Sequence, residues 1–185
     1  MDIELVLKSL VPFGSALLGG YITYSMSRAK EKKEVAKKQL ESVFELQKIN
    51  FKLLGMFNEL KISLHRHAFS DVQTEEYSGK IVADKIQKCL NEWIELNVAS
   101  LAHAVNMEKG IFELVKKTHD EATVHFMPVT KAENVVIKGM TRIYSEKNIS
   151  SLETVYDKIE HLQTALMEQE KVYVERYMKK YNKHL

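Results

Sequence analysis

An uncharged run near the N-terminus constrains the fold of this chain more than any other feature. Residues 9–27 contain no Lys, Arg, Asp or Glu, and the run ends abruptly at Arg28 and the lysines that follow it. As an α-helix these 19 residues extend over ~28 Å, close to the ~30 Å hydrocarbon thickness of a bilayer. The run therefore predicts a single transmembrane helix. The alternatives are a helix that lies in the membrane interface and an apolar helix buried in a soluble bundle.

The charges around this run predict the orientation of the helix. Six basic residues follow the run, against Lys8 before it, and the positive-inside rule places such a basic flank in the cytoplasm. The six are Arg28, Lys30, Lys32, Lys33, Lys37 and Lys38. A cleaved signal peptide carries its positive charge before the apolar stretch rather than after it. We therefore expect residues 1–27 to form a cell-membrane anchor with its N-terminus outside, and residues 28–185 to form a cytoplasmic domain.

The anchor contains rows of small residues that a soluble helix would not favour. Each glycine inside a soluble helix costs roughly 1 kcal/mol relative to alanine. In this run small side chains recur every four residues and form one flat face, which comprises Ser15, Ala16, Gly19, Gly20 and Thr23. Such faces let two membrane helices approach closely and pack by van der Waals contact. We expect the anchor to associate with a second copy of the chain or with another membrane protein.

The sequence after the anchor predicts an all-α domain. Only Pro12 and Pro128 interrupt a helix-favouring composition, and apolar residues recur at three- and four-residue intervals. The first of these amphipathic stretches covers residues 29–69, and we expect it to leave the membrane without a hinge. Helices that each carry one apolar side can bury those sides only by packing together. The predicted architecture is the anchor followed by an antiparallel bundle of four or five cytoplasmic helices.

Turn residues and apolar rows divide this bundle into its predicted helices. A break over residues 70–79 precedes a helix that is expected to bury one row of apolar residues. That row is Ile86, Leu90, Ile94, Val98, Leu101 and Val105, with Cys89 and Trp93 beside it. Gly110 predicts the end of this helix or a kink in it, and Pro128 predicts the end of a short third segment. Capping-box spacing at Thr130 and at Ser150 predicts two further helix starts.

The C-terminal segment carries the second basic cluster. Residues 171–185 have a net charge of +4, as do residues 28–38, although the whole chain is only +2. The last helix is expected to combine three tyrosines with nearby lysines, namely Tyr173, Tyr177, Tyr181, Lys179, Lys180 and Lys183. This pattern predicts contact with anionic lipid or with an acidic partner, and the alternative is a core-facing tyrosine row with a solvated basic end. Two local clusters rather than one basic face argue against nucleic acid as a partner.

Few residues offer catalytic chemistry. No glycine-rich phosphate loop, HExxH or GxSxG motif is present, and the lone Cys89 falls on the apolar side of its helix, where packing is its expected role. The histidines allow one catalytic alternative, a metal-dependent phosphohydrolase of the HD type. Its metal ligands would be His65 or His67, His119, Asp120 and Asp157. For His119 and Asp120 we favour a surface His–Asp pair, and no cofactor is implied.

Three functions fit these features. The favoured hypothesis is a membrane-tethered interaction module, whose anchor self-associates and whose bundle binds a cytoplasmic protein. The second is a phage-derived or defence-related effector that disrupts the bilayer when many anchors cluster. The third is the HD-type hydrolase. We expect a protein without enzymatic activity, whose partners are the bilayer, a second copy or another membrane protein, and a cytoplasmic protein.

Overall fold

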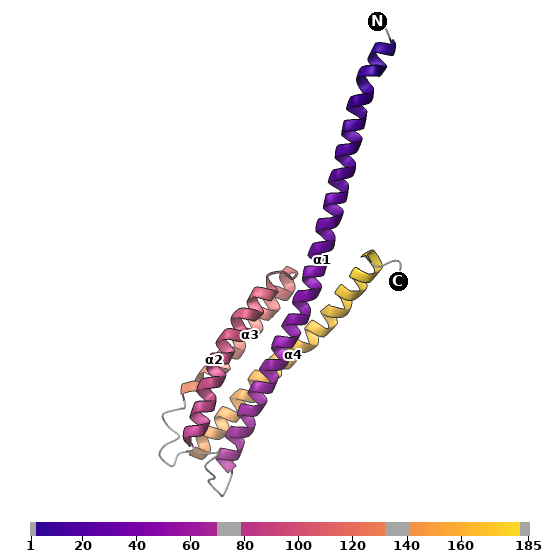
Figure 1. Cartoon of the computed structure of the whole chain (residues 1–185). Helices are drawn as coiled ribbons and strands as arrows, with labels where there is room; N and C mark the ends of the chain where they lie inside the picture. The colour runs from indigo at the N-terminus through magenta and orange to yellow at the C-terminus, as the bar shows by residue number, and fades with distance from the viewer. Residues whose placement is uncertain (1–2, 70–78, 132–140, 182–185) are drawn as a thin grey trace.

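Four helices make up the described secondary structure of the chain. The computed structural model describes residues 3–69, 79–131 and 141–181, and it describes side chains for residues 20–67, 81–131 and 147–181. The helices are α1 (Ile3–Phe69), α2 (Gly79–Ala104), α3 (Lys109–Lys131) and α4 (Thr141–Tyr181). Figure 1 shows that α1 continues far beyond the other three helices at its N-terminal end. The prediction of an all-α fold is confirmed for these ranges.

The four helices form an antiparallel bundle whose neighbours follow the chain order. α1 packs against α2 and α4, and α3 packs against the same two helices, so α1 and α3 lie diagonally opposite each other. The C-terminal part of α1 is therefore one of the four bundle helices (Figure 1). α1 is a single helix from Ile3 to Phe69, without a hinge at the predicted membrane exit. The predicted antiparallel bundle is thus present, with four helices rather than five in the described part of the chain.

Aromatic rings fill the centre of the bundle. Phe57, Trp93 and Phe126 come from α1, α2 and α3, and each is at most 1% exposed. The Phe57 ring lies 5.5 Å from that of Trp93 and 5.1 Å from that of Phe126, between ring centroids. Full burial of a large apolar side chain stabilises a fold by about 1.5–3 kcal/mol. The core has two apolar clusters. These rings lie in the lower cluster, and the upper cluster, nearer the N-terminal extension of α1, includes Val43 and Leu166.

A layer of polar side chains separates the two apolar clusters. Each helix contributes one buried residue to this polar layer, namely Asn50, Ser100, His119 and Gln163, and all four are at most 4% exposed. Along each helix, the residue lies between members of the lower cluster and members of the upper cluster. Their side-chain nitrogen and oxygen atoms have no hydrogen-bond partner among the residues that the structure describes. Buried polar groups stabilise a fold only when they are hydrogen-bonded, so substitutions in this polar layer are expected to change stability.

Several predicted helix boundaries are wrong. α2 ends at Ala104, before Gly110, which instead lies in the first turn of α3. α3 continues through Pro128 to Lys131, although a proline inside a helix removes one backbone hydrogen bond and crowds the preceding turn. Thr130 lies inside α3, where its hydroxyl donates to the backbone oxygen of Met127 at 2.8 Å, so it does not cap a new helix. The helix expected next falls partly on residues 132–140, outside the described residues, and α4 begins at Thr141 rather than at Ser150.

The predicted apolar row of α2 is only partly buried. Ile94, Val98 and Val105 are 53%, 66% and 65% exposed. The side of α2 that faces the core carries Val82, Ile86, Cys89, Trp93, Ser100 and Ala104. Apolar residues occupy more than one side of this helix, and the side with Trp93 removes the larger apolar surface from water when it is buried. The prediction is therefore right for Ile86 and wrong for Ile94, Val98 and Val105, which form an exposed apolar surface.

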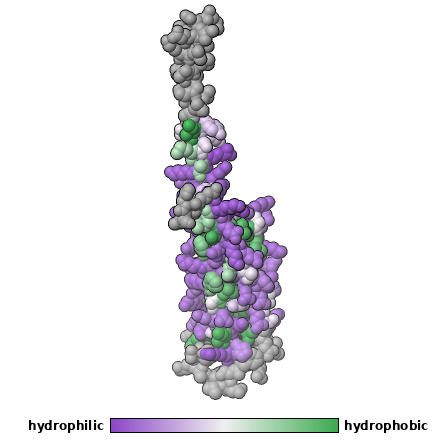
Figure 2. Space-filling view, turned by 90° about the vertical axis from the view of Figure 1, so that its right-hand side faces the viewer, coloured by the Kyte–Doolittle hydropathy of each residue, from purple (hydrophilic) through white to green (hydrophobic). Residues whose placement is uncertain are grey.

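The side chains of the predicted anchor are described only from residue 20 onward. Ser15, Ala16 and Gly19 of the predicted small-residue face lie outside the residues whose side chains are described, whereas Gly20 and Thr23 are exposed. Within the described residues, no helix contains a stretch that is long and apolar enough to cross a membrane. Figure 2 shows hydrophilic side chains over most of one face of the bundle, with apolar patches in a broken band along its middle.

Candidate functional site

The C-terminal end of α4 lies beside the part of α1 in which the uncharged run ends and the basic residues begin. Residues from both helices line a hollow of about 390 Å³, which we call the basic–aromatic groove. Its defining residues are Tyr21, Tyr24, Arg28 and Lys32 from α1 and Lys180 and Tyr181 from α4. A second hollow of about 360 Å³ shares Arg28, Lys32, Lys180 and Tyr181 and extends toward the bundle. The structure thus brings the two basic clusters of the sequence into one site.

Helix geometry explains why these residues meet. Tyr21, Tyr24, Arg28 and Lys32 follow one another at intervals of three or four residues, so they occupy one side of α1. α4 runs antiparallel to α1 (Figure 1), so that Lys180 and Tyr181 in its C-terminal turns line the same hollow as these α1 residues. Tyr173 fixes the approach of α4, because it is only 3% exposed and packs into the upper apolar cluster.

The groove has an excess of positive charge. None of the ion pairs between described residues involves Arg28, Lys32 or Lys180, and Glu31 is the one acidic residue that lines either hollow. The guanidinium of Arg28 lies 6.0 Å from the centre of the Tyr24 ring, and the ammonium of Lys180 lies 5.5 Å from that of Tyr181. At such distances the face of an aromatic ring attracts a cation. The groove therefore presents cations that are held by aromatic rings and open to an anionic ligand.

A nearby ion pair holds α4 in place and leaves the groove cations unpaired. Arg176 donates to Glu108, in the turn between α2 and α3, at 2.7 Å. This hydrogen bond, with the charge of Glu108, raises the pKa of the Arg176 guanidinium. Its positive charge is therefore matched within the bundle, unlike the charges of Arg28 and Lys180. We assign Arg176 a structural role at the edge of the groove.

The structure distributes the other residues of the two predicted basic surfaces around the groove. Tyr177 and Tyr181 are half-buried, and their rings lie 5.4 Å apart, whereas Tyr173 belongs to the core. Four further lysines are exposed, namely Lys30, Lys33, Lys38 and Lys179, and Lys37 forms an ion pair with Glu41 at 3.4 Å. Lys183 lies outside the described residues.

His119 and Asp120, the adjacent pair of the HD-type hypothesis, project to different sides of α3. His119 is 1% exposed, and its ring stacks on that of Trp93 at 5.2 Å with an interplanar angle of 15°. Burial lowers the pKa of His119 to about 4. Asp120 is exposed and pairs with Lys116 at 3.0 Å. The interpretation of His119 as part of a surface pair is therefore wrong, because successive residues of a helix project to different sides.

The other proposed ligands do not join His119. His65 and Asp157 are exposed residues on α1 and α4, whereas His119 lies in the core. Among the residues that the structure describes, no group of three or more His, Cys, Asp or Glu side chains is arranged to hold a metal ion. The residues of the HD-type hypothesis are thus not assembled into one site by the described part of the fold.

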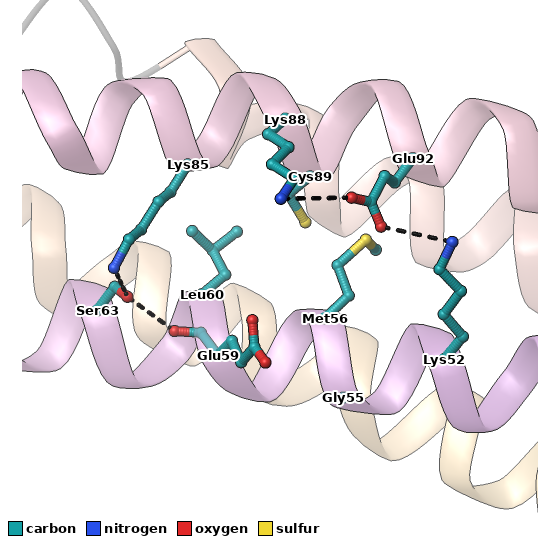
Figure 3. A pocket seen from close by; sticks show the side chains of 10 residues that line it. All are labelled: Lys52, Gly55, Met56, Glu59, Leu60, Ser63, Lys85, Lys88, Cys89 and Glu92. Carbon is teal, nitrogen blue, oxygen red and sulfur yellow. Dashed lines mark hydrogen bonds and ion pairs between the residues drawn. The ribbon is translucent and has the colours of Figure 1, made fainter.

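A hollow of about 370 Å³ lies between α1 and α2 (Figure 3). Glu92 lies at one end of the hollow, 3.8 Å from the ammonium of Lys52 and 4.0 Å from that of Lys88. Cys89 contributes to the wall but is only 4% exposed. Burial raises the pKa of its thiol to about 12, and the charge of Glu92 acts in the same direction. A thiol that stays protonated is a poor nucleophile, so the predicted packing role of Cys89 is confirmed.

Two further features were not found by sequence reasoning. One is the polar layer. In the sequence it could have been recognised from a polar residue inside an apolar row, such as Asn50 among Leu46, Ile49 and Leu53. The other is a hollow of about 490 Å³ between α1 and α4, whose lining includes Phe51 and Gly55. The signal for this hollow is Gly55 itself, because a glycine inside an amphipathic helix leaves a notch in its surface.

Comparison of the chain with models of protein families, with curated proteins and with solved structures finds no match. Among the described features, the basic–aromatic groove combines charge, aromatic contacts and a hollow, and it lies next to the uncharged run. It is the candidate functional site that we develop.

Proposed function

We propose that the chain is a membrane-anchored helical interaction module. In this proposal residues 9–27 cross the membrane and the N-terminus lies outside. The continuous helix α1 connects this anchor to the bundle, which lies on the cytoplasmic side. The basic–aromatic groove lies at the membrane surface and binds the phosphate groups of anionic lipids. The observation that carries the proposal is the meeting of both basic clusters in one groove, directly after the uncharged run.

The order of residues along α1 supports this position for the groove. Tyr21 and Tyr24 lie at the end of the uncharged run, where tyrosines of membrane helices favour the boundary between hydrocarbon and water. Arg28 and Lys32 follow one and two turns later, at the depth of lipid headgroups. Lys180 is brought to the same place by α4. Each basic residue near an anionic membrane surface contributes about 1 kcal/mol to attraction, so three act together in the groove.

Gly20 supports the association of anchors. A side-chain carbon added at Gly20 would meet no atom of the described chain within 4 Å. Packing within one copy therefore does not require glycine there, although glycine destabilises a helix relative to alanine. A small residue with free space beside it is suited to the close approach of another helix, as in membrane helices with repeated small residues. The self-association expected from the sequence thus remains part of the proposal.

The exposed apolar residues of α2 support binding of a cytoplasmic protein. Ile94, Val98 and Val105 are more than half exposed, and residues 96–107, which include Val98 and Val105, contain no Lys, Arg, Asp or Glu. An uncharged apolar strip on a chain with 28% charged residues is typical of a surface that another protein covers. We assign the partner surface of the bundle to this strip.

Fractionation of the full chain tests the anchor. We expect the protein to stay in the membrane pellet after an alkaline wash, and a reporter fused after Leu185 to be active in the cytoplasm. A matched chain without residues 1–27 should appear in the soluble fraction. Recovery of the full chain in the soluble fraction without detergent would refute the anchor.

Native mass spectrometry of the full chain in detergent tests the groove. We expect added phosphatidylglycerol, but not phosphatidylcholine or inorganic phosphate, to form adducts with the wild type. The double variant Arg28→Gln/Lys180→Gln should lose these adducts, because it removes two of the three groove cations. The control Lys88→Gln/Lys116→Gln changes two exposed lysines outside the groove and should keep them. Equal adduct formation by both double variants would show that the groove is not the lipid site.

A further inference from the structure

The basic–aromatic groove adjoins the second hollow between α1 and α4, which extends toward the bundle. The two hollows have volumes of about 390 and about 360 Å³, and they share Arg28, Lys32, Lys180 and Tyr181. We call the part of the second hollow beyond these shared residues the bundle-side hollow. Its own lining residues are Glu31, Val35, Ala36, Gln39 and Arg176. A ligand in the groove thus has a second lined space directly beside it.

The bundle-side hollow lies further from the proposed anchor than the headgroups of ordinary phospholipids reach. In the proposed function the hydrocarbon layer ends near Ser27, and a headgroup layer of about 5–8 Å covers it on each side. At about 1.5 Å per helical residue, Arg28 and Lys32 lie within this layer, whereas Val35 and Gln39 lie about 12 and about 18 Å beyond Ser27. A lipid phosphate at Arg28 and Lys32 therefore leaves the bundle-side hollow to a part of the ligand that continues past the phosphate.

The charges of the bundle-side hollow do not suit a second phosphate. Glu31 is exposed and carries a negative charge into this hollow. The one cation that lines only this hollow is Arg176, which is already paired with Glu108 at 2.7 Å. A phosphate placed here would face the carboxylate of Glu31 and would find no unpaired cation among these lining residues, and like charges repel. The part of the ligand in the bundle-side hollow is therefore expected to be uncharged.

The polar side chains of the bundle-side hollow suit hydroxyl groups. The carboxylate of Glu31 accepts hydrogen bonds, and the amide of Gln39 both donates and accepts them. Among the described residues neither side chain has a hydrogen-bond or ion-pair partner. Glu31, Val35 and Gln39 follow one another at four-residue intervals on one side of α1, and Val35 and Ala36 supply apolar surface between the two polar groups. This order matches a ring whose edges carry hydroxyls and whose faces are carbon.

We propose that the groove and the bundle-side hollow together bind an anionic lipid whose phosphate carries an uncharged, hydroxyl-rich ring, such as inositol or a sugar. The inference rests on the proposed function, for which it names the class of lipid. The phosphate contacts Arg28, Lys32 and Lys180, and the ring lies in the bundle-side hollow. There its hydroxyls donate to the carboxylate of Glu31 and exchange hydrogen bonds with the amide of Gln39.

The other end of the groove favours a lipid over a soluble phosphate ester. Tyr21 and Tyr24 line the groove at the end of the uncharged run, where the acyl chains of a bound lipid would continue into the bilayer. The second hollow, at about 360 Å³, has the size of a site for a small molecule or headgroup. The ligand is therefore expected to combine acyl chains at the tyrosines, a phosphate at the cations and a ring at Gln39.

Native mass spectrometry of the full chain in detergent tests the class of lipid. We expect phosphatidylinositol to form adducts about tenfold more readily than phosphatidylglycerol, because the inositol ring adds hydrogen bonds in the bundle-side hollow that the glycerol headgroup is too short to make. Both lipids carry one phosphate, so the groove cations attract them equally. Equal adduct formation by the two lipids would overturn the inference.

A double variant tests the residues of the bundle-side hollow. Glu31→Ala/Gln39→Ala removes both hydroxyl-binding groups, and we expect the ratio of phosphatidylinositol to phosphatidylglycerol adducts to fall to about one. The control Gln87→Ala/Glu95→Ala removes the same two kinds of group from exposed positions on α2 and should keep the ratio of the wild type. Matching helix content by circular dichroism shows that both chains are folded. An unchanged ratio in Glu31→Ala/Gln39→Ala would contradict the assignment of the ring to this hollow.

Two further ligands test the source and the charge of the headgroup. Glycerophosphoinositol, which is the same headgroup without acyl chains, should form no adduct at the concentration used for the lipid. An adduct as abundant as that of phosphatidylinositol would overturn the lipid as the ligand. A phosphatidylinositol with a further phosphate on its ring should bind no more tightly than phosphatidylinositol, because Glu31 repels the added charge. Tighter binding of this lipid would overturn the uncharged ring.

Failure of this inference can be told from failure of the proposed function. If the wild type forms adducts with neither phosphatidylinositol nor phosphatidylglycerol, the groove is not a lipid site and the proposed function of the groove fails. If it forms adducts with both equally, the groove remains a lipid site and only the role of the bundle-side hollow is refuted.

Discussion

His119 makes the stability of the bundle depend on pH. Its ring lies in the polar layer, stacked on Trp93 and 1% exposed, and both ring nitrogens lack a hydrogen-bond partner among the described residues. A positive charge on this ring would be buried without a partner, so burial lowers the pKa of His119 to about 4, against a small opposing effect of Asp120. In the unfolded chain the same ring has a pKa of about 6.5. Unfolding at mildly acidic pH therefore takes up a proton.

The size of the effect follows from the difference between the two pKa values. Above about pH 6.5 the ring is neutral in both states and the full stability is present. As the pH falls from about 6.5 to about 4, the unfolded state binds a proton that the folded state does not bind, and stability falls. The slope approaches about 1.4 kcal/mol per pH unit. The total loss from this one residue is about 3 kcal/mol at pH 4, a large part of the 5–15 kcal/mol typical of a domain.

Urea unfolding of the full chain in a neutral detergent measures this loss. The free energy of unfolding is compared between wild type and His119→Phe at several values of pH between about 7 and about 4, which covers the expected transition. Phenylalanine retains a ring beside Trp93 but does not titrate, so the other histidines and the carboxylates contribute equally to both chains. We expect the advantage of His119→Phe to grow by about 3 kcal/mol between pH 7 and pH 4. A constant difference would refute the assignment of a buried, neutral His119.

Two other substitutions test the assignment of core and surface. Trp93→Ala should lower the free energy of unfolding by about 3–5 kcal/mol. Val98→Ala, on the exposed side of the same helix, should lower it by less than about 0.5 kcal/mol. Similar losses in urea unfolding would contradict the assignment of Trp93 to the core and Val98 to the surface. Asn50→Leu should raise the unfolding free energy by about 1–2 kcal/mol, because it replaces an unpaired buried amide by an apolar group of similar size. A lower urea midpoint for Asn50→Leu would show that the Asn50 amide has a bonding partner.

The class of fold could be predicted from the sequence because it follows from local patterns. Three- and four-residue apolar spacing specifies amphipathic helices, and helices with one apolar side each must pack together. The predicted break over residues 70–79 lies between α1 and α2. Helix ends were predicted less well where two local signals compete. At Pro128, for example, the proline signals a helix end, but the helix continues past it, and Phe126 and Val129 on either side are buried in the core.

The sides of the helices could not all be assigned, because several have more than one apolar side. On α2 both the side with Trp93 and the side with Val98 have apolar spacing, and only the packing of α1 and α3 decides which is buried. The candidate site, too, could be predicted from the sequence only in part. The sequence shows two basic clusters far apart in the chain. The first was predicted to lie at a membrane, and the second to contact anionic lipid or an acidic partner. That Arg28 and Lys180 line one groove depends on the antiparallel order of α1 and α4 and on the length of α4.

The continuous helix α1 connects the proposed anchor and the bundle in a specific way. One side of α1, with Leu46 and Phe57, forms part of the core of the bundle. Because the helix has no hinge between Gly20 and Phe57, a rotation of the proposed anchor about its axis would also turn this side of α1 and the helices packed against it. In the proposal, the helix that contributes to the core therefore also sets how the basic–aromatic groove faces the membrane.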